Sequence, residues 1–268
     1  MNILLRIQQN YNNLTKKEKY VADYILKEKS YIDNISISSL AKKTEVSVGT
    51  ITKVSKKLGY DNFVDMKLAI AKTDRGNRDI DNDNFAIVYE FYKEIVERAN
   101  EILSVEVLQD LLKEINSHRT VHVYGIGSSG LSAMEFQYRL MRLGYQVQSK
   151  NEYHQMIINS NCLNSDDLVI AISVNGQTHE IVEAVELAKL REAYTIAITS
   201  AEDSPLAKTC DYFIPIINAE FIKEHEFINS QFSILYLLDI ICKFLLEDEV
   251  RYENFNKTVK YIKKKYKY

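Results

Sequence analysis

The stretch TVHVYGIGSSG, residues 120–130, joins an apolar run to a glycine-rich turn and decides how the C-terminal part of the chain folds. Gly125, Gly127 and Gly130 follow the spacing G-x-G-x-x-G. Such a turn between a strand and a helix binds phosphate, because its backbone N–H groups and the helix N-terminus both favour an anion. The spacing alone leaves two alternatives, a dinucleotide or another phosphate compound.

Four more short apolar runs follow this one. They read YQVQS, DLVIAIS, YTIAITS and DYFIPII and occupy residues 145–149, 167–173, 194–200 and 211–217. Helical patterns at about 129–143, 154–160 and 179–190 separate the first four runs. Strands that alternate with helices predict a parallel sheet with helices on both faces. A further helix is expected at about 222–246, before a basic tail at 257–268.

The end of the second run tests the dinucleotide alternative. A dinucleotide site uses an acidic residue there to bind the ribose hydroxyls. Here the run ends in Ser149 and Lys150, and Glu152 comes slightly late. The sequence therefore weakens the dinucleotide alternative without removing it.

A second polar turn follows the third run. It reads SVNGQT, residues 173–178, and is rich in hydroxyl and amide groups. Together with Ser128 and Ser129 it predicts two polar loops at one edge of the sheet, where open α/β folds bind ligands. Several such groups around one point suit a compact phosphomonoester. The alternative is that both are ordinary strand–helix turns whose Ser and Thr residues cap helices.

The N-terminal part of the chain has purely helical patterns. Residues 14–29 predict a helix that begins with a capping box, Thr15 and Glu18. Residues 36–60 predict a helix-turn-helix. Its first helix, at about 38–43, directs Leu40 and Ala41 inward, and a tight turn follows at 44–46. Ser47 caps the second helix, and Gly59 ends it. The apolar side of the second helix is expected to carry Val48, Ile51, Val54 and Leu58.

Charge differs between the two parts of the chain. Residues 1–72 hold 13 Lys and Arg against 7 Asp and Glu, a net charge of +6, whereas the rest of the chain carries −9 and the whole −3. A small basic domain on an acidic body is a first indication of a nucleic-acid partner. The polar segment at 73–84 reads as a linker between a domain at 1–72 and a second domain at 85–268. Helical patterns resume at 85–103 and 105–115.

Composition excludes several classes of protein. The 268 residues are 46% hydrophobic and 26% charged, which is typical of globular proteins. The three cysteines, at positions 162, 210 and 242, stand far apart, so neither a disulfide framework nor a metal site is expected. This cysteine usage predicts a protein of the reducing cytoplasm. No export signal is visible at the start. Polar residues interrupt the longest apolar stretch, 227–246, which favours a buried helix over a membrane span.

Taken together, these motifs resemble a known family. GIGSSG, IAISVNGQTHE at 170–180, the stretch 196–216 and Glu220 are similar to a SIS (sugar isomerase) domain. Residues 14–67 resemble the N-terminal domain of RpiR-type bacterial transcription regulators. The resemblance implies an all-α helix-turn-helix domain followed by an α/β domain with a doubly wound parallel sheet of the flavodoxin-like kind. It also implies a regulator of carbohydrate-metabolism genes that binds double-stranded DNA and senses a phosphosugar, with no cofactor.

The resemblance and the residue patterns select two sets of candidate residues. The resemblance implies a phosphosugar site built from Ser128, Ser129, Ser173, Asn175 and Thr178. The second helix of the helix-turn-helix is expected to enter the major groove of DNA. Its polar residues cluster at the N-terminus and on the solvent side: Ser47, Thr50, Thr52, Lys53, Lys56 and Lys57.

Three positions depart from the family pattern. Asn175 stands where a second Ser is usual, and Asn donates through a larger amide. Glu224 stands where Arg is expected in many members, and an acidic group would repel an anion if it faced the site. Lys53 and Val54 stand where Arg-Phe is common, and Lys lacks the bidentate contact that Arg makes with guanine.

SIS domains also occur in isomerases and etherases, which form the alternative function. Those reactions need a base placed to move a proton. The candidates are Glu152, His154, Glu180, Glu220, Glu224 and His225. For each one, binding a sugar hydroxyl or facing water is the simpler interpretation, and His118 and His122 are interpreted as structural. A basic helix-turn-helix favours the regulator, because an isomerase has no use for one.

We also expect a homodimer or higher oligomer. The sequence leaves open whether the regulator is a repressor or an activator. The expected helix at 222–246 is a candidate for a subunit contact, although core burial explains it equally well.

Overall fold

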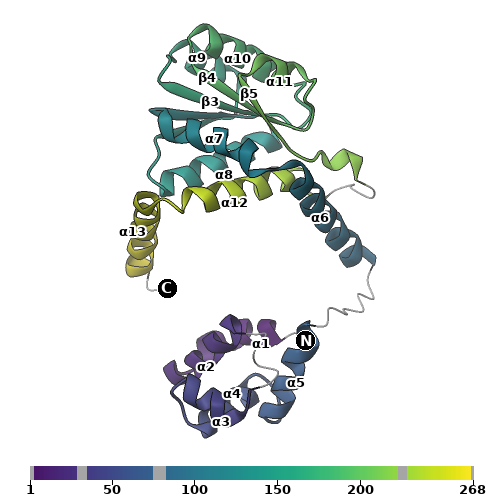
Figure 1. The fold of residues 1–268 in the computed structure, drawn as a ribbon, viewed down its shortest axis with the longest axis vertical. Coiled ribbons are helices and arrows are strands. Elements are labelled where there is room, and N and C mark those ends of the chain that lie inside the picture. Colours follow the sequence, from purple (N-terminus) through teal and green to yellow (C-terminus); the bar gives the residue numbers. More distant parts are fainter. Residues whose placement is uncertain (1–2, 29–34, 75–82, 223–227, 267–268) are drawn as a thin grey trace. The chain divides into compact units, whose positions relative to one another are not determined.

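The computed structural model describes residues 3–28, 35–74, 83–222 and 228–266. The chain divides into two compact units, Met1–Asp81 and Asn82–Tyr268. Figure 1 shows that the first unit is entirely helical and that the second contains a sheet between helices. Each unit is described by itself.

The first unit is built from short helices around one core. Buried apolar residues of the five α-helices described in this unit make up most of this core, including Ile7, Ile25, Leu40, Ile51 and Met66. The elements are α1 (Ile3–Asn10), η1 (Tyr11–Asn13), α2 (Lys16–Lys27), α3 (Ile37–Lys43), α4 (Val48–Lys57) and α5 (Phe63–Asp74).

The helix ends of this unit follow the sequence signals. The Thr15 amide donates to the Glu18 carboxylate at 2.7 Å before α2. The Ser47 hydroxyl oxygen accepts from the Thr50 amide at 3.1 Å and so satisfies one open donor at the start of α4. Gly59, at a φ of +80°, follows α4. The predicted helix starts and the predicted helix-turn-helix are thereby confirmed.

One predicted core residue of α4 is exposed. Ile51, Val54 and Leu58 are buried as expected, but Val48 is 43% exposed. The whole start of the helix, Ser47–Gly49, is exposed, so this turn extends past the face that packs on the core. The inclusion of Val48 on the apolar side was therefore wrong.

The second unit contains a five-stranded parallel sheet. The strand order is β2-β1-β3-β4-β5, and each neighbouring pair is parallel. Every predicted strand forms, because each apolar run is long enough to cross the sheet and ends in a turn. The strands are β1 (Thr120–Tyr124), β2 (Val147–Lys150), β3 (Asp167–Ile172), β4 (Tyr194–Thr199) and β5 (Tyr212–Pro215).

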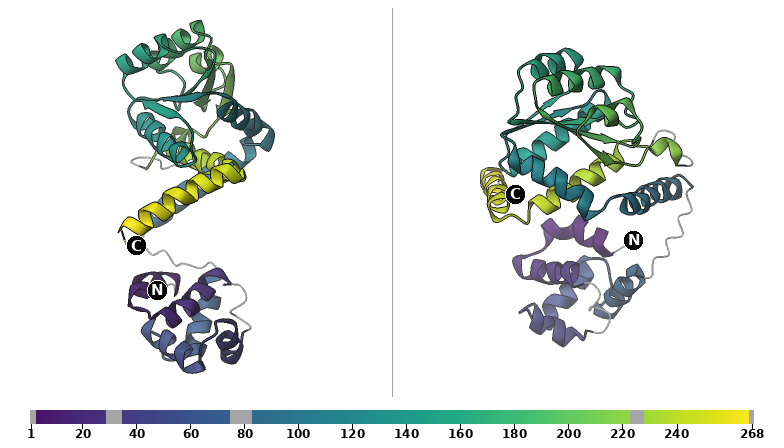
Figure 2. Two further views of the ribbon diagram at one scale, coloured as in Figure 1. Left: turned by 90° about the vertical axis from the view of Figure 1, so that its left-hand side faces the viewer. Right: turned by 45° about the horizontal axis from the view of Figure 1, so that its top comes forward.

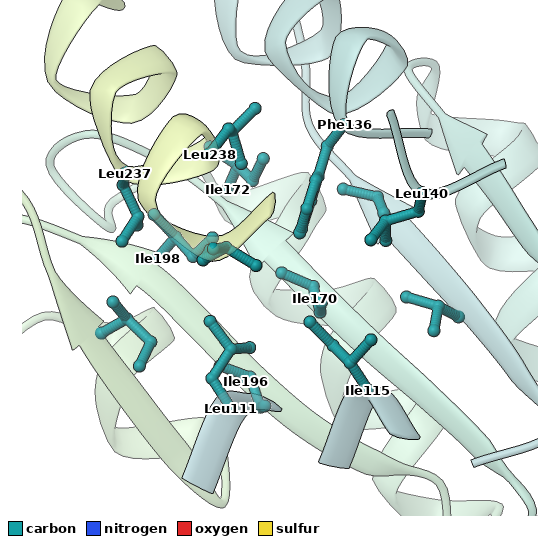
Figure 3. Close-up of a cluster of buried hydrophobic side chains, with 14 of the residues drawn as sticks. Leu111, Ile115, Phe136, Leu140, Ile170, Ile172, Ile196, Ile198, Leu237 and Leu238 are labelled. Carbon is teal, nitrogen blue, oxygen red and sulfur yellow. The ribbon is translucent and has the colours of Figure 1, made fainter. Parts of the chain in front are cut away.

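Helices cover both faces of this sheet (Figure 1). On one face lie α7 (Val105–Ser117), α8 (Ser128–Arg142) and α12 (Phe232–Leu245), which share a core with the strands. Figure 3 shows Phe136 of α8 and Leu238 of α12 beside Ile172 of β3 in this core. The other face is covered by α9 (Tyr153–Asn161), α10 (His179–Leu190) and α11 (Pro205–Thr209).

Three further elements complete the second unit. Helix α6 (Asp83–Ile102) packs on α12, and η3 (Ala219–Phe221) follows β5. Helix α13 (Glu249–Tyr266) runs away from the sheet as one long helix (Figure 2) and carries part of the basic tail. Within the described part of the chain, no helix combines the length and apolar character needed to cross a membrane.

The last core helix begins later than the sequence suggested. The helix expected at 222–246 starts only at Phe232, and residues 223–227 lie outside the described residues. The Asn229 side chain accepts from the Gln231 amide at 2.9 Å, and this side-chain turn competes with helix before Phe232. The buried residues of α12 pack within their own unit. Core burial, one of the two explanations for this apolar helix, therefore accounts for its buried face.

Candidate functional site

Two loops meet at one edge of the sheet. β1 and β3 are parallel neighbours, with Tyr124 opposite Ala171 near their C-terminal ends. The chain leaves β1 toward β2 on one side of this pair and leaves β3 toward β4 on the other. Open α/β sheets bind ligands where the strand order reverses in this way. The turns after β1 and β3 therefore occupy the expected position of a ligand site.

The first loop depends on glycine for the close approach of strand and helix. A Cβ on Gly125 would lie 2.6 Å from the Ser129 carbonyl oxygen, and one on Gly130 would lie 2.9 Å from the Gly125 carbonyl oxygen. Gly127 has a φ of +59°, and the space around its Cβ position is open. Two glycines thus permit packing, and the third permits the turn.

The start of α8 is open to an anion. Gly127 is its N-cap, no side chain accepts a hydrogen bond there, and its first turn holds no acidic residue. The first N–H groups of a helix lack partners within the helix and carry partial positive charge. Ser128, which is exposed, and Ser129, which is half-buried, add hydroxyl donors at this point.

The second loop is held by its own side chains. Ser173 is only 3% exposed, and its hydroxyl lies 2.9 Å from the Thr178 hydroxyl. Asn175 is exposed, and its side-chain oxygen Oδ1 accepts from the Gln177 backbone amide at 3.1 Å. An Asn side chain at this position therefore stabilises the turn. Within the described chain, no hydrogen bond joins this loop to the first one.

Residues at the end of β4 hold the second loop in place. The hydroxyls of Thr199 and Ser200 donate to the Val174 carbonyl oxygen at 3.2 and 2.7 Å. Gly176 has a φ of +66°, and a Cβ there would lie 2.2 Å from the Ser204 hydroxyl oxygen. None of these residues was among the predicted site residues. Their signal was that the fourth run ends in Thr-Ser directly before a turn, much as the third run ends in Ser.

Gln231 is a further residue of this edge that the sequence analysis did not select. Its side-chain carbonyl oxygen accepts from the hydroxyls of Ser129 and Ser132 at 3.3 and 3.2 Å. Gln231 as a residue is 8% exposed and comes from the turn before α12, about a hundred residues along the chain from Ser129. A polar residue that interrupts an apolar stretch was its only sequence signal.

The candidate bases are distributed over several elements. Glu152 and His154 are exposed at the start of α9, Glu180 is exposed in the first turn of α10, and Glu220 is exposed in η3. Glu224 and His225 lie outside the described residues. No hydrogen bond joins any two of the four described candidates.

The two histidines near β1 lie in structural surroundings. The His118 ring nitrogen Nδ1 lies 2.9 Å from the Glu114 carbonyl oxygen at the end of α7. His122 is 4% exposed, and its Nε2 lies 3.5 Å from the Asp167 carboxylate. Burial lowers the pKa of His122 below its usual value, and the nearby Asp167 carboxylate opposes this shift.

In the first unit, α4 presents the predicted polar residues at its start and along one side. Ser47, Lys53 and Lys56 are exposed, and Thr50 and Thr52 are half-buried. The Ser47 and Thr50 hydroxyls lie 2.9 Å apart, and the Thr52 hydroxyl donates to the Val48 carbonyl oxygen at 3.2 Å.

Lys57 differs from the other α4 candidates because its side chain contacts residues of the first unit outside α4. Its ammonium donates to the Glu18 carboxylate at 2.8 Å and to the Asn13 carbonyl oxygen at 3.3 Å. Burial raises the pKa of Glu18, but hydrogen bonds from Lys57 and Thr15 outweigh this and hold the pKa below its usual value. Lys57 thus fastens α4 to α2.

Two family models match the chain in the order of its two units. The model described as a helix-turn-helix domain of the rpiR family matches residues 1–76, and the SIS domain model matches residues 114–241. A transcriptional regulator of the helix-turn-helix type from Clostridium perfringens is 33% identical over 97% of this chain and 95% of its own length. The chain belongs to the RpiR family.

Other similar proteins agree with this assignment. A regulator of the helix-turn-helix type from Haemophilus influenzae is 28% identical over 92% of this RpiR-family chain and 91% of its own. Among solved structures, the Vibrio vulnificus NanR protein complexed with ManNAc-6P has a TM-score of 0.61 at 22% identity, over 97% of this chain and 98% of that one. The sugar isomerase domain of an RpiR transcription factor from Sphaerobacter thermophilus has a TM-score of 0.59 at 20% identity, over 65% of this chain and 96% of that domain. These two likenesses show the fold.

Proposed function

We propose that this protein is a transcriptional regulator that binds double-stranded DNA through α4 and a phosphorylated sugar at the edge between β1 and β3. The observation that carries the proposal is the presence of both parts in one chain: a helix-turn-helix, and an uncapped α8 N-terminus beside a hydroxyl-rich loop. The match to the rpiR-family and SIS models supports this combination.

The phosphate is bound by backbone and hydroxyl donors. The open N–H groups of α8 attract the anion, Ser128 and Ser129 donate from the same turn, and Ser173, Asn175 and Thr178 complete the site from the other loop. Two features favour a phosphosugar over a dinucleotide. β2 ends in Lys150 rather than an acidic residue, and Glu152 occupies the N-cap position of α9.

A ligand screen tests this part of the proposal. We expect a phosphorylated sugar to raise the melting temperature of the purified protein, whereas the same sugar without phosphate does not. Hexose 6-phosphates, pentose 5-phosphates and ManNAc-6P form the panel, the last because the Vibrio vulnificus protein was solved with it. Tight binding of NAD(H) or NADP(H), with no response to any phosphosugar, would contradict the proposal.

DNA binding is tested by its dependence on salt. Lys56 is exposed, and we assign it a phosphate contact, so Lys56→Gln is expected to weaken binding to all duplexes and to lower the salt slope by about one unit. Thr50→Ala or Lys53→Ala is expected to change sequence preference instead. Lys57→Gln also removes the Glu18 ion pair, so its binding data need a parallel unfolding measurement. If the protein does not bind its own promoter DNA at low salt, the proposed DNA binding is contradicted.

Ligand sensing, rather than catalysis, is the proposed role of the second unit. The relatives compared above are named as transcriptional regulators, which supports this choice. We therefore expect no product from any panel compound after prolonged incubation, as judged by phosphorus NMR. Detection of an isomerised sugar would contradict it.

We also propose that the protein acts in the cytoplasm as a homodimer or larger assembly, with two α4 helices that read two half-sites. Phosphosugar binding changes regulation only through its differential affinity for two arrangements of these helices. Light scattering at micromolar concentration tests the assembly, and a monomer would contradict it.

A further inference from the structure

Gln231 connects the first turn of α8 to the start of α12. Its carbonyl oxygen accepts from Ser129 and Ser132, and its Nε2 lies 3.3 Å from the Ser230 hydroxyl. The Gln231 backbone amide donates to the Asn229 side chain. The amide group of Gln231 is therefore held from both sides in a buried position, although it belongs to neither of the two loops.

A bound phosphate competes with Gln231 for one proton. A serine hydroxyl has a single hydrogen to donate. In the structure Ser129 donates it to Gln231, and in the proposed function the same hydroxyl donates to phosphate. A charged acceptor makes the stronger hydrogen bond, so phosphate binding removes one of the two donors to the Gln231 oxygen.

The residue after Gln231 packs against α6. The ring centroids of Phe232 and Tyr92 lie 4.2 Å apart, in a cluster that also holds Phe91 and Ile222. One turn further along α12, the Tyr236 hydroxyl donates to the Asn100 side chain of α6 at 2.9 Å. Helix α6 is the first helix of the second unit, so in chain order it directly follows the segment that leads from the DNA-binding unit.

We propose that Gln231 is a sensing residue of the site: it gives up the Ser129 hydroxyl when phosphate binds, and the resulting shift at the start of α12 reaches α6 through the contact between Phe232 and Tyr92. This inference rests on the proposed function, because it needs a phosphate at Ser129.

The chain contains no tryptophan, so one introduced at Tyr92 reports on this contact alone. In full-length Tyr92→Trp, titration with inorganic phosphate and with ManNAc-6P is expected to change the tryptophan emission in step with binding measured by calorimetry. In Tyr92→Trp with Gln231→Ala, we expect binding to persist within about tenfold, because the substitution removes a neutral hydrogen bond that phosphate displaces in any case. We expect the emission change to disappear.

Gln137→Ala is the matched control. It removes the side-chain amide of another glutamine, one in α8 that accepts from the Ser149 amide and has no hydrogen bond to Ser129 or α12. The control is expected to keep the emission change. If inorganic phosphate and the whole phosphosugar panel fail to bind, the proposed function fails and this inference falls with it. If they bind but the emission never changes, or changes equally in the Gln231→Ala variant, only the sensing role of Gln231 is overturned.

Discussion

The two loops at the edge of the sheet form the proposed phosphosugar site by different means. The loop after β1 supplies backbone donors, and its central glycine stands in open space. The loop after β3 supplies side-chain hydroxyls, and residues from the end of β4 fill the space behind it. Backbone donors need glycines that let a ligand approach, whereas side-chain donors need a rigid support that holds their rotamers. The two loops should therefore respond differently to the same kind of substitution.

The sharpest test compares Gly176 with Gly127. Gly176→Ala places a Cβ against Ser204 and Thr199 at a positive φ, so overpacking and backbone strain add. We expect a loss of about 3 kcal/mol or more in the free energy of unfolding. Gly127→Ala meets no atom within 4 Å and carries strain alone, which costs about 1–3 kcal/mol. Urea unfolding followed by circular dichroism measures both.

A double variant separates clash from strain at Gly176. Ser204→Gly removes the atoms nearest to the new Cβ, so it should recover part of the loss in the Gly176→Ala background. Equal destabilisation by the two Gly→Ala changes, with no recovery in the double variant, would mean that the support from β4 does not distinguish the loops.

Removing one hydroxyl from each loop compares their donors. Ser129→Ala and Thr178→Ala should each weaken phosphosugar binding about ten- to a hundredfold, because a hydrogen bond to a charged group is worth roughly 1.5–3 kcal/mol. Stability should separate them. Thr178→Ala leaves the buried Ser173 hydroxyl without its partner, whereas Ser129→Ala leaves Gln231 bonded to Ser132. Calorimetry and thermal unfolding on the same samples decide whether the second loop alone loses stability.

We expect the free energy of unfolding to depend on pH through a buried histidine in the strands beneath the loops. His122 of β1 faces Asp167 of β3, and burial lowers the pKa of His122. The unfolded chain therefore binds a proton more readily than the folded one. Stability from this group is complete above about pH 6.5 and falls as the pH drops toward the folded pKa, by at most about 1.4 kcal/mol per pH unit. His122→Asn should flatten this part of the curve of unfolding free energy against pH, and an unchanged curve would assign the acid sensitivity to other groups.

The smallest effect is expected at Asn175. Its side chain is exposed and already accepts from the Gln177 amide, a role that a serine hydroxyl also fills. Asn175→Ser should therefore change phosphosugar affinity by less than about tenfold, the equivalent of one neutral hydrogen bond. A larger change would show that the amide itself contacts the ligand and that the second loop contributes more than hydroxyls.

Local signals were sufficient for most of the fold. Five apolar runs, the first four of them separated by helical patterns, predicted the parallel sheet, because each run spans a strand and a turn follows it. The capping residues Thr15 and Ser47 marked helix starts that the structure confirms. Both loops of the candidate site were found in the same way, since the C-terminal ends of parallel strands share one edge of a sheet.

The sequence by itself determined the order of the strands, the helices between the first four of them, the helix-turn-helix and the position of the two loops, because these depend on neighbouring residues. Only the tertiary structure decided which distant residues meet. It paired Lys57 with Glu18, exposed Val48, and began α12 ten residues later than its apolar pattern suggested. It also brought Gln231 to Ser129 across a hundred residues. Such contacts depend on how the helices pack on the sheet, and no local spacing records that packing.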